Sequence, residues 1–135
     1  MKKILAPMFA VALLYSCSNS DDNSIPVNPD EKYLDGFFVS NEGNFTKANA
    51  STSHINGGMT AITNDIFRTS NGRALGDVSQ HMVVTDKYVF VVMNNSNTIE
   101  VVNKKTFKSV HTISQNLNSP RYAVIKNNKL YVTSL

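Results

Sequence analysis

The stretch KYVFVVMNNSNTIEVVN, residues 87–103, contains two β-rich runs joined by a short polar link. The first run, KYVFVVM (87–93), is almost entirely apolar, which is typical of a strand covered on both faces. The second run, TIEVV (98–102), alternates, so that Ile99 and Glu100 belong to opposite faces. Because the four-residue link has the length of a hairpin connection, the two runs are predicted to pair antiparallel.

Similar β-rich runs occur on both sides of this pair, and turn residues separate them. They are GFFVS (36–40), HMVV (81–84), KSVHTI (108–113), RYAVI (121–125) and KLYVTSL (129–135). Few windows show apolar residues spaced by three or four, so long helices are not expected. The sequence therefore predicts an all-β fold in which neighbouring strands run antiparallel.

Part of the chain repeats itself. SQHMVVTDKYVFVV begins at Ser79, and SPRYAVIKNNKLYVTS begins at Ser119, an offset of 40 residues. Lys87 and Lys129 then align with an offset of 42, so the alignment predicts a two-residue insertion in the turn. A repeat of about 40 residues with four strands is typical of a β-propeller blade. GFFVSNEG is interpreted as part of an earlier blade, stretched by an insertion around NFTKANAS.

One complete blade is predicted, and the next begins at Arg121 and reaches Leu135 within its second strand. The four strands of the complete blade are expected at about 81–85, 87–93, 98–102 and 108–113. Repeat units bury their faces against their neighbours. Residues 33–135 are therefore interpreted as a partial β-propeller domain, an N-terminal fragment of about two and a half blades. A small complete sandwich or open sheet remains the alternative.

The first residues have the three parts of a secretory leader. MKK is a short positive start, and ILAPMFAVALLY is an apolar run of twelve residues, too short to span a bilayer as a helix. Leu14, Ser16 and Cys17 then resemble the bacterial lipobox. Residues 1–16 are predicted to be a lipoprotein signal peptide, with lipid attached at Cys17, the only cysteine. A free or buried thiol is the alternative.

The segment 17–32 is polar and contains two prolines, so it is predicted to be a disordered tether behind the lipidated cysteine. Its SNSDD stretch resembles the acidic export signal of surface lipoproteins in Bacteroidetes-type bacteria. This resemblance implies a protein anchored in the outer membrane through its lipid and exposed at the cell surface.

Charge and motif content limit the chemistry that the chain is expected to perform. The formal net charge is +3, but without Lys2 and Lys3 of the leader the excess is about one positive charge, so no nucleic-acid partner is expected. His54, His81 and His111 lack the spacing of metal ligands. No nucleophile motif, phosphate-binding loop or carboxylate pair occurs. The sequence predicts neither a metal site nor a cofactor, and a protein that is not an enzyme.

Several stretches together resemble a known family. They are GFFVSNEGNF, ITNDIFRTSNGRALGDVSQHM, NNSNTIEVVN with KTFKSV, and NSPRYAV with LYVTSL. These stretches are similar to propeller lipoproteins of Bacteroidetes, within the wider YVTN-type (YncE-like) seven-bladed propellers, over about 100 residues from Tyr33 onward. The resemblance implies a surface lipoprotein that works beside a TonB-dependent transporter. One branch of the family binds cobalamin, so a corrinoid ligand is implied as well.

Propeller geometry predicts where a ligand would bind. One rim should gather four loops: Asn41–Asn44, Gly76–Gln80, Asn94–Asn97 and Ser119–Pro120. Asn94, Asn95 and Arg121 are the candidate ligand-binding residues on that rim, and His81 and Arg121 are placed at equivalent positions. Structural roles for the asparagines, which tolerate positive φ, and for the arginine remain open.

Two function classes are therefore expected to compete. The first is a binding module that captures a small-molecule nutrient, such as a corrinoid, for a TonB-dependent transporter. The alternative is a structural or interaction propeller that binds a protein or a glycan at the cell surface.

Overall fold

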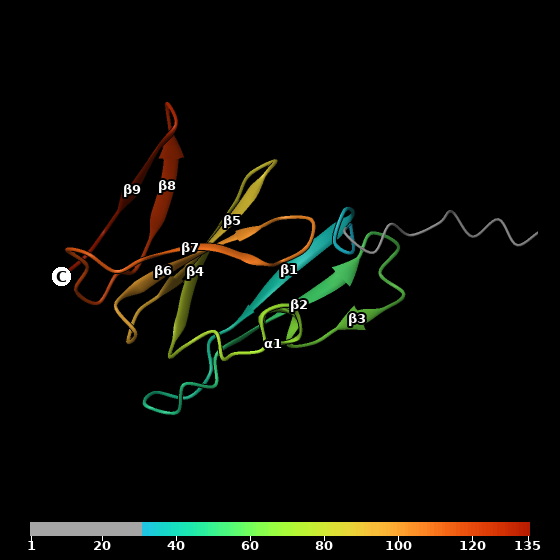
Figure 1. Ribbon diagram of the computed structural model, residues 1–135, viewed down its shortest axis with the longest axis horizontal. Helices are drawn as coiled ribbons and strands as arrows, with labels where there is room; N and C mark the ends of the chain where they lie inside the picture. The colour runs from blue at the N-terminus through green and yellow to red at the C-terminus, as the bar shows by residue number, and fades with distance from the viewer. Residues whose placement is uncertain (1–30) are drawn as a thin grey trace, which may run out of the picture.

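The computed structural model describes residues 31–135, which form three antiparallel sheets and one short helix (Figure 1). We call them the first sheet (β1-β2-β3), the second sheet (β4-β5-β6-β7) and the third sheet (β8-β9). The predicted signal peptide, Cys17 and the tether up to residue 30 lie outside the described residues. The expected all-β class is confirmed.

The second sheet is a four-stranded meander, as predicted. Its strands are β4 (Ser79–Val84), β5 (Tyr88–Met93), β6 (Thr98–Asn103) and β7 (Ser109–Ile113). Each pairs antiparallel with the next, and Val91 lies opposite Glu100 in the β5–β6 register. A bulge in β4 between Ser79 and His81 places one extra residue, Gln80, in that strand.

The first sheet contains β1 (Gly36–Asn41), β2 (Ser51–Asn56) and β3 (Ile62–Thr63). β1 was predicted from its apolar run, and residues 57–61 link β2 to β3. β2 was not predicted, because its sequence STSHIN is mostly polar. Thr52, Ser53 and His54 are nevertheless buried.

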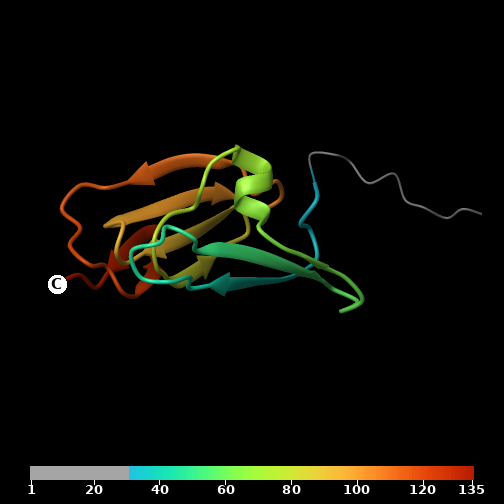
Figure 2. The same ribbon diagram turned by 90° about the horizontal axis from the view of Figure 1, so that it is seen from below.

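The short helix α1 (Ile66–Asn71) follows the first sheet and lies on one side of the molecule (Figure 2). Its six residues are consistent with the expectation of no long helix. Ile66 and Phe67 are fully buried. Asn71 attaches the helix to the β6–β7 link, because its Nδ2 donates to the Phe107 carbonyl (3.0 Å) and its Oδ1 accepts from the Ser109 N–H (2.8 Å).

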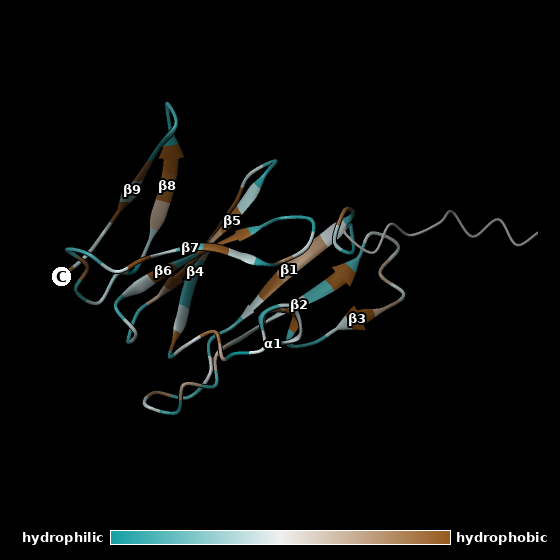
Figure 3. Ribbon diagram, viewed as in Figure 1, coloured by the Kyte–Doolittle hydropathy of each residue, from teal (hydrophilic) through white to brown (hydrophobic). Residues whose placement is uncertain are grey.

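The third sheet is a hairpin of β8 (Ala123–Lys126) and β9 (Lys129–Val132). Both strands were predicted, with longer bounds. The two turn residues, Asn127 and Asn128, have φ values of 51° and 58°. Positive φ at both positions matches the primed two-residue turn that suits the twist of a hairpin, and asparagine tolerates it better than most residues do. The strands are largely hydrophobic, whereas their turn is hydrophilic (Figure 3).

Two apolar clusters hold the sheets together. The first, between the first and second sheets, contains Tyr33, Ala50, Ile66, Phe67, Leu75, Val89, Val91, Met93, Val102 and Phe107. The second, between the second and third sheets, has Val92, Ile99 and Ala123 at its centre, with half-buried neighbours. Strand β5 contributes to both clusters, which confirms the prediction that it is covered on both faces.

The structure corrects the predicted alignment of the repeat. Met82 pairs with Val91 on the face toward the first sheet, and Ala123 pairs with Val132 on the face toward the second sheet. Equivalent faces therefore align with a constant offset of 41 residues (Met82 to Ala123, Val91 to Val132), without an insertion. With offsets of 40 and 42, residues that pair across one hairpin are still aligned with residues that pair across the other. Each residue is then aligned with one on the opposite face of the sheet, since side chains alternate along a strand.

The corrected register also changes one pair of equivalent residues. His81 corresponds to Tyr122, not to Arg121 as predicted, because the offset is 41 after the β4 bulge. Before the bulge Ser79 and Ser119 align with an offset of 40, because two residues lie between Ser119 and Tyr122 whereas only Gln80 lies between Ser79 and His81.

Candidate functional site

The four predicted loops meet at one edge of the sheets, which we call the rim: Asn41–Asn44, Gly76–Gln80, Asn94–Asn97 and Ser119–Pro120. Backbone hydrogen bonds join them, from the Ser79 N–H to the Glu42 carbonyl (3.1 Å) and from the Asn94 N–H to the Val78 carbonyl (2.8 Å). Ser40 Oγ and Ser79 Oγ are 2.6 Å apart at the same place. The predicted gathering of these loops is confirmed.

Asp77 is the centre of the rim. Its side chain is buried, and Oδ2 accepts from the Thr46 N–H (2.8 Å) and from Asn95 Nδ2 (2.6 Å). Its own backbone N–H donates to Ser96 Oγ (2.8 Å). The other carboxylate oxygen, Oδ1, is buried and has no hydrogen-bond partner within residues 31–135. One carboxylate thus holds together loops from the first and second sheets.

Sequence reasoning missed Asp77. Its one signal is the preceding Gly76, which has φ 142°, and a Cβ there would lie 2.7 Å from Ser96 Oγ. Only glycine fits this close approach of two loops. A Gly-Asp pair immediately before a strand was therefore a usable sign of a buried loop carboxylate.

Asn94 and Asn95 lie on the rim, half-buried, and both use their amide donors within the protein. Asn94 Nδ2 donates to the Pro120 carbonyl at 3.0 Å, which ties the second sheet to the third. Asn95 Nδ2 donates to Asp77. Their amides thus order the loops, and the prediction that they contact a ligand stays a prediction.

Arg121 is exposed where the chain enters the third sheet. Its backbone N–H donates to the Thr133 carbonyl at 2.9 Å, whereas its guanidinium has no hydrogen-bond partner within the described part of the chain. His81, also near the rim, accepts a hydrogen bond at Nδ1 from the Ala123 N–H (3.3 Å) and meets the Tyr122 ring at 5.6 Å between centroids. The structure thus assigns His81 to the contact between sheets and leaves the Arg121 side chain in solvent.

The other two histidines lie away from the rim. His54 is buried beside Tyr33 and Phe38, with ring centroids at 5.1 and 5.4 Å. Burial lowers the pKa of His54, and a hydrogen bond to the Asp35 backbone only partly opposes this. His111 is exposed on β7. Within residues 31–135, no three His, Cys, Asp or Glu side chains come together as metal ligands would.

A second polar centre surrounds Glu100, which is 2% exposed in β6. Its carboxylate accepts from Arg73 Nη2 (2.7 Å), from Thr112 Oγ1 (3.0 Å) and from Ser109 Oγ. The Arg73 guanidinium also lies 4.8 Å from the centroid of the Phe67 ring. This buried charge is thus fully partnered and connects the segment after α1 to the outer strands of the second sheet.

A cavity of about 420 Å³ opens between the hairpins β4–β5 and β8–β9. Its lining is mostly apolar and includes Tyr88, Phe90, Ile125 and Leu130. Thr85 and Asn128, at the hairpin turns, also border it, so it opens at the end of the sheets opposite the rim.

Fold and site together define an all-β protein whose antiparallel sheets stack face to face and present a polar rim. No family model and no curated protein matches the chain. Among the described residues, no helix is long and apolar enough to cross a membrane.

Proposed function

We propose that the three sheets are successive blades of a β-propeller in a surface lipoprotein, and that the protein captures a small-molecule nutrient at its rim. The nutrient is a corrinoid, which the protein delivers to a TonB-dependent transporter. The observation that carries this proposal is the rim itself, where loops from all three sheets form one hydrogen-bonded polar surface.

The stacking of the sheets supports the blade arrangement. β1 lies next to β4, and β4 lies next to β8, so each sheet contacts the following one near its first strand. The constant 41-residue offset means that Met82 and Ala123 occupy the same position on equivalent faces. A repeat that presents equivalent faces to its neighbours is what a propeller requires.

The chemistry of the rim suits a large polar ligand. Corrinoids carry many amide side chains, which need both donors and acceptors. The exposed guanidinium of Arg121 provides several donors in a fixed plane. The hydrogen bonds of Asn94 and Asn95 keep the loops around it ordered, so a rigid ligand would lose little entropy on binding.

Calorimetry with cyanocobalamin and the full chain tests the ligand. Arg121→Ala is expected to weaken binding about tenfold, the loss of one charge-assisted contact. Arg68→Ala is the matched control, since Arg68 is also exposed but lies on α1 and pairs with Asp65. Absence of measurable binding at micromolar protein rejects the corrinoid, and equal affinities of the wild type and Arg121→Ala remove Arg121 from the site.

The anchor is tested separately. Metabolic labelling with a palmitate analogue is expected to mark the protein at Cys17, and Cys17→Ala should abolish the label. Label that persists in Cys17→Ala would refute lipid attachment at this residue.

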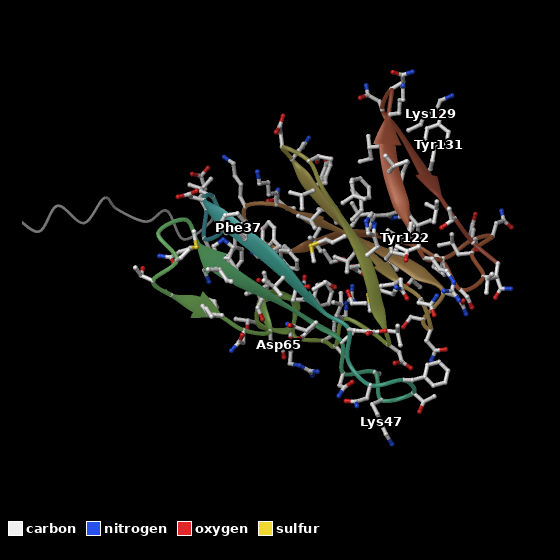
Figure 4. The ribbon with its side chains drawn as sticks, turned by 180° about the vertical axis from the view of Figure 1, so that it is seen from behind. Phe37, Lys47, Asp65, Tyr122, Lys129 and Tyr131 are labelled. Atoms are coloured by element: carbon white, nitrogen blue, oxygen red, sulfur yellow. The ribbon has the colours of Figure 1, made fainter. Side chains whose placement is uncertain are left out.

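The alternative, an interaction propeller for a protein or a glycan, is favoured by one observation. The outer face of the third sheet exposes Tyr122 (56%), Val124 (59%) and Tyr131 (53%) (Figure 4). In this alternative no further blade covers that face, and its exposed aromatic rings bind a protein or stack on sugars. Tyr131→Ala should then reduce binding to glycans or surface proteins without changing the corrinoid titration.

A further inference from the structure

The end of the sheets opposite the rim is rich in lysine. The turns β4–β5, β6–β7 and β8–β9 lie there, together with the start of β1, because the strands run from the rim to this end or back. Figure 4 shows Lys129 beside the β8–β9 turn, whereas Lys47 lies in a loop beyond the other end of the strands. Every lysine of residues 31–135 except Lys47 belongs to what we call the basic end: Lys32, Lys87, Lys104, Lys105, Lys108, Lys126 and Lys129.

Carboxylates do not balance the charge of the basic end. Three acidic residues lie beside the seven lysines, which leaves an excess of four positive charges: Glu31, Asp35 and Asp86. Elsewhere in residues 31–135, four basic and four acidic residues cancel one another. Of the seven lysines, only Lys105 forms an ion pair within the described chain, with Glu31 (2.6 Å). The net charge of the described chain therefore belongs to one end of the sheets.

The lysines of the basic end stay in solvent when sheets stack. Neighbouring sheets contact one another through their faces, and the second sheet is covered on both of its faces. Lys87, Lys105 and Lys108, at the turns of this covered sheet, are nevertheless exposed. A neighbour on each face thus leaves the lysines at the ends of the strands accessible.

The segment that leads to Cys17 joins the fold at the basic end. The Tyr33 N–H donates to the Lys105 carbonyl (3.0 Å), next to the ion pair of Lys105 with Glu31. Thirteen residues lie between Cys17 and Glu31, and a chain of this length spans at most about 50 Å. We propose that the basic end rests on the lipid surface that holds the anchor, with its lysines against phosphate-bearing headgroups. The inference rests on the lipid anchor of the proposed function.

The chemistry of lysine suits such a partner. An ammonium group is a compact charge that contacts phosphate without a fixed geometry, as a fluid layer of headgroups requires. Each lysine close to an anionic lipid surface strengthens binding about fivefold, and charges more than about 8 Å away are screened by physiological salt. Because the excess charge lies at one end, the attraction also orients the molecule. The rim then points away from the membrane, where a ligand reaches it from solution.

Vesicle sedimentation with the full chain carrying Cys17→Ala tests the surface without the lipid. The probe is vesicles of equal parts phosphatidylglycerol and phosphatidylethanolamine. Binding to them is expected at low salt and should fall steeply as salt is added, whereas vesicles of phosphatidylcholine alone should not bind. Absence of binding to the anionic vesicles, or equal binding to both kinds, overturns the proposal.

Two double variants with the same change of net charge locate the surface. Lys126→Gln with Lys129→Gln removes two charges from the basic end and should weaken vesicle binding about twentyfold. Lys47→Gln with Arg68→Gln removes two exposed charges elsewhere and should leave binding nearly unchanged. Equal losses in the two double variants overturn the location.

A fluorescent label reports the orientation. In the Cys17→Ala chain, Thr60→Cys provides one labelling site in the β2–β3 link, at the same end as the lysines. Phe45→Cys provides one in the β1–β2 loop at the rim, where Phe45 is 67% exposed. A quencher carried by the lipid should dim the label at position 60 strongly and the label at position 45 little. Equal quenching, or stronger quenching at position 45, overturns the orientation.

Palmitate labelling of the wild type keeps this inference apart from the proposed function. Label at Cys17 without vesicle binding of Cys17→Ala refutes only the role of the basic end. Vesicle binding of Cys17→Ala without label in the wild type refutes only the anchor. The cyanocobalamin titration is independent of both.

Discussion

The side chains between the first and second sheets are more completely buried than those between the second and third sheets. The first contact buries Phe67, Phe107 and Met93 completely. The second is centred on Val92 and Ile99, and the larger side chains around them, such as Phe90 and Leu130, stay half-buried. Strand β5 lies in both contacts, so its sequence does not explain the difference.

What differs is the width of the covering layer. The first contact has three strands, the helix α1 and the chain around Tyr33 on one side, whereas the second has only the two strands of the third sheet. The edge strand β7 of the second sheet is therefore less covered than β6, whose Ile99 and Val102 are buried on opposite faces. Ile113, for example, reaches the second cluster but remains half-buried. Burial, and with it hydrophobic stabilisation, follows the number of elements that cover a face.

The largest expected effect comes from the first contact. Phe107→Ala removes a ring that is fully buried, so urea denaturation should show a loss of about 3–5 kcal/mol in the free energy of unfolding. The removed surface and the remaining cavity both contribute to this loss.

Phe90→Ala is the matched substitution in the second contact. Because Phe90 is half-buried and borders an open cavity, the loss should be smaller, about 1–2 kcal/mol. Equal losses of stability in Phe107→Ala and Phe90→Ala would contradict the conclusion that the first contact buries its side chains more completely than the second.

The next effect concerns the buried carboxylate of Glu100. Arg73→Ala leaves this carboxylate without its cationic partner, although Ser109 and Thr112 still donate to it. Because the Arg73 side chain is 46% exposed, the loss should be smaller than for a fully buried ion pair. We expect the free energy of unfolding to fall by about 1–3 kcal/mol. Urea denaturation of Arg73→Ala, and of the double variant that combines Arg73→Ala with Glu100→Gln, measures this loss of stability. The double variant should be more stable than Arg73→Ala, and a further loss would show that the carboxylate is not the destabilising group.

The second sheet was predictable because its strands are rich in β-branched and aromatic residues. β2 was not, since its buried residues Thr52 and His54 carry no hydrophobic signal. α1 was missed because six residues are too few to show a helical period. The repeat was recognised, but its alignment was wrong by one residue in each strand. Pairing alone does not determine which face a side chain occupies, whereas the packing of Met82 and Ala123 does.

The rim was predictable at the level of loops and not of side chains. Turn residues marked Asn94–Asn97 and Ser119–Pro120 as links, and the repeat placed them at one edge. Asp77, which organises the rim, has partners as far away as Thr46, and such long-range hydrogen bonds leave no local pattern in the sequence.

A pH effect is expected from the first contact. Burial lowers the pKa of His54, so the unfolded chain binds a proton more readily than the folded chain does. The stability from this group is complete above its ordinary pKa of about 6.5 and falls as the pH drops through the window below it. In urea denaturation, His54→Gln should flatten this fall below about pH 6.5. His111→Gln, at an exposed site on β7, is the control and should keep the wild-type slope.

The smallest expected effect tests how the rim joins the second sheet to the third. Asn97 Oδ1 accepts the Ser119 N–H at 2.7 Å, and the bond is exposed to solvent. Asn97→Ala should therefore cost only about 1 kcal/mol in global stability, since water replaces most of the lost interaction and alanine tolerates the φ of 54° at this position only slightly less well than asparagine. The local effect should be clearer, because the Ser119 amide loses its acceptor.

Hydrogen exchange measured by NMR is the sensitive readout of this loss, and the Ser119 amide should exchange several-fold faster in Asn97→Ala. Asn49→Ala is the matched control. Asn49 Oδ1 accepts the Asn44 N–H at 2.7 Å within the first-sheet part of the rim, so its loss should leave Ser119 unchanged. Faster exchange at Ser119 in both variants would mean that the rim opens as one unit. Faster exchange only in Asn97→Ala means that the link to the third sheet opens by itself, as the thinner second contact leads us to expect.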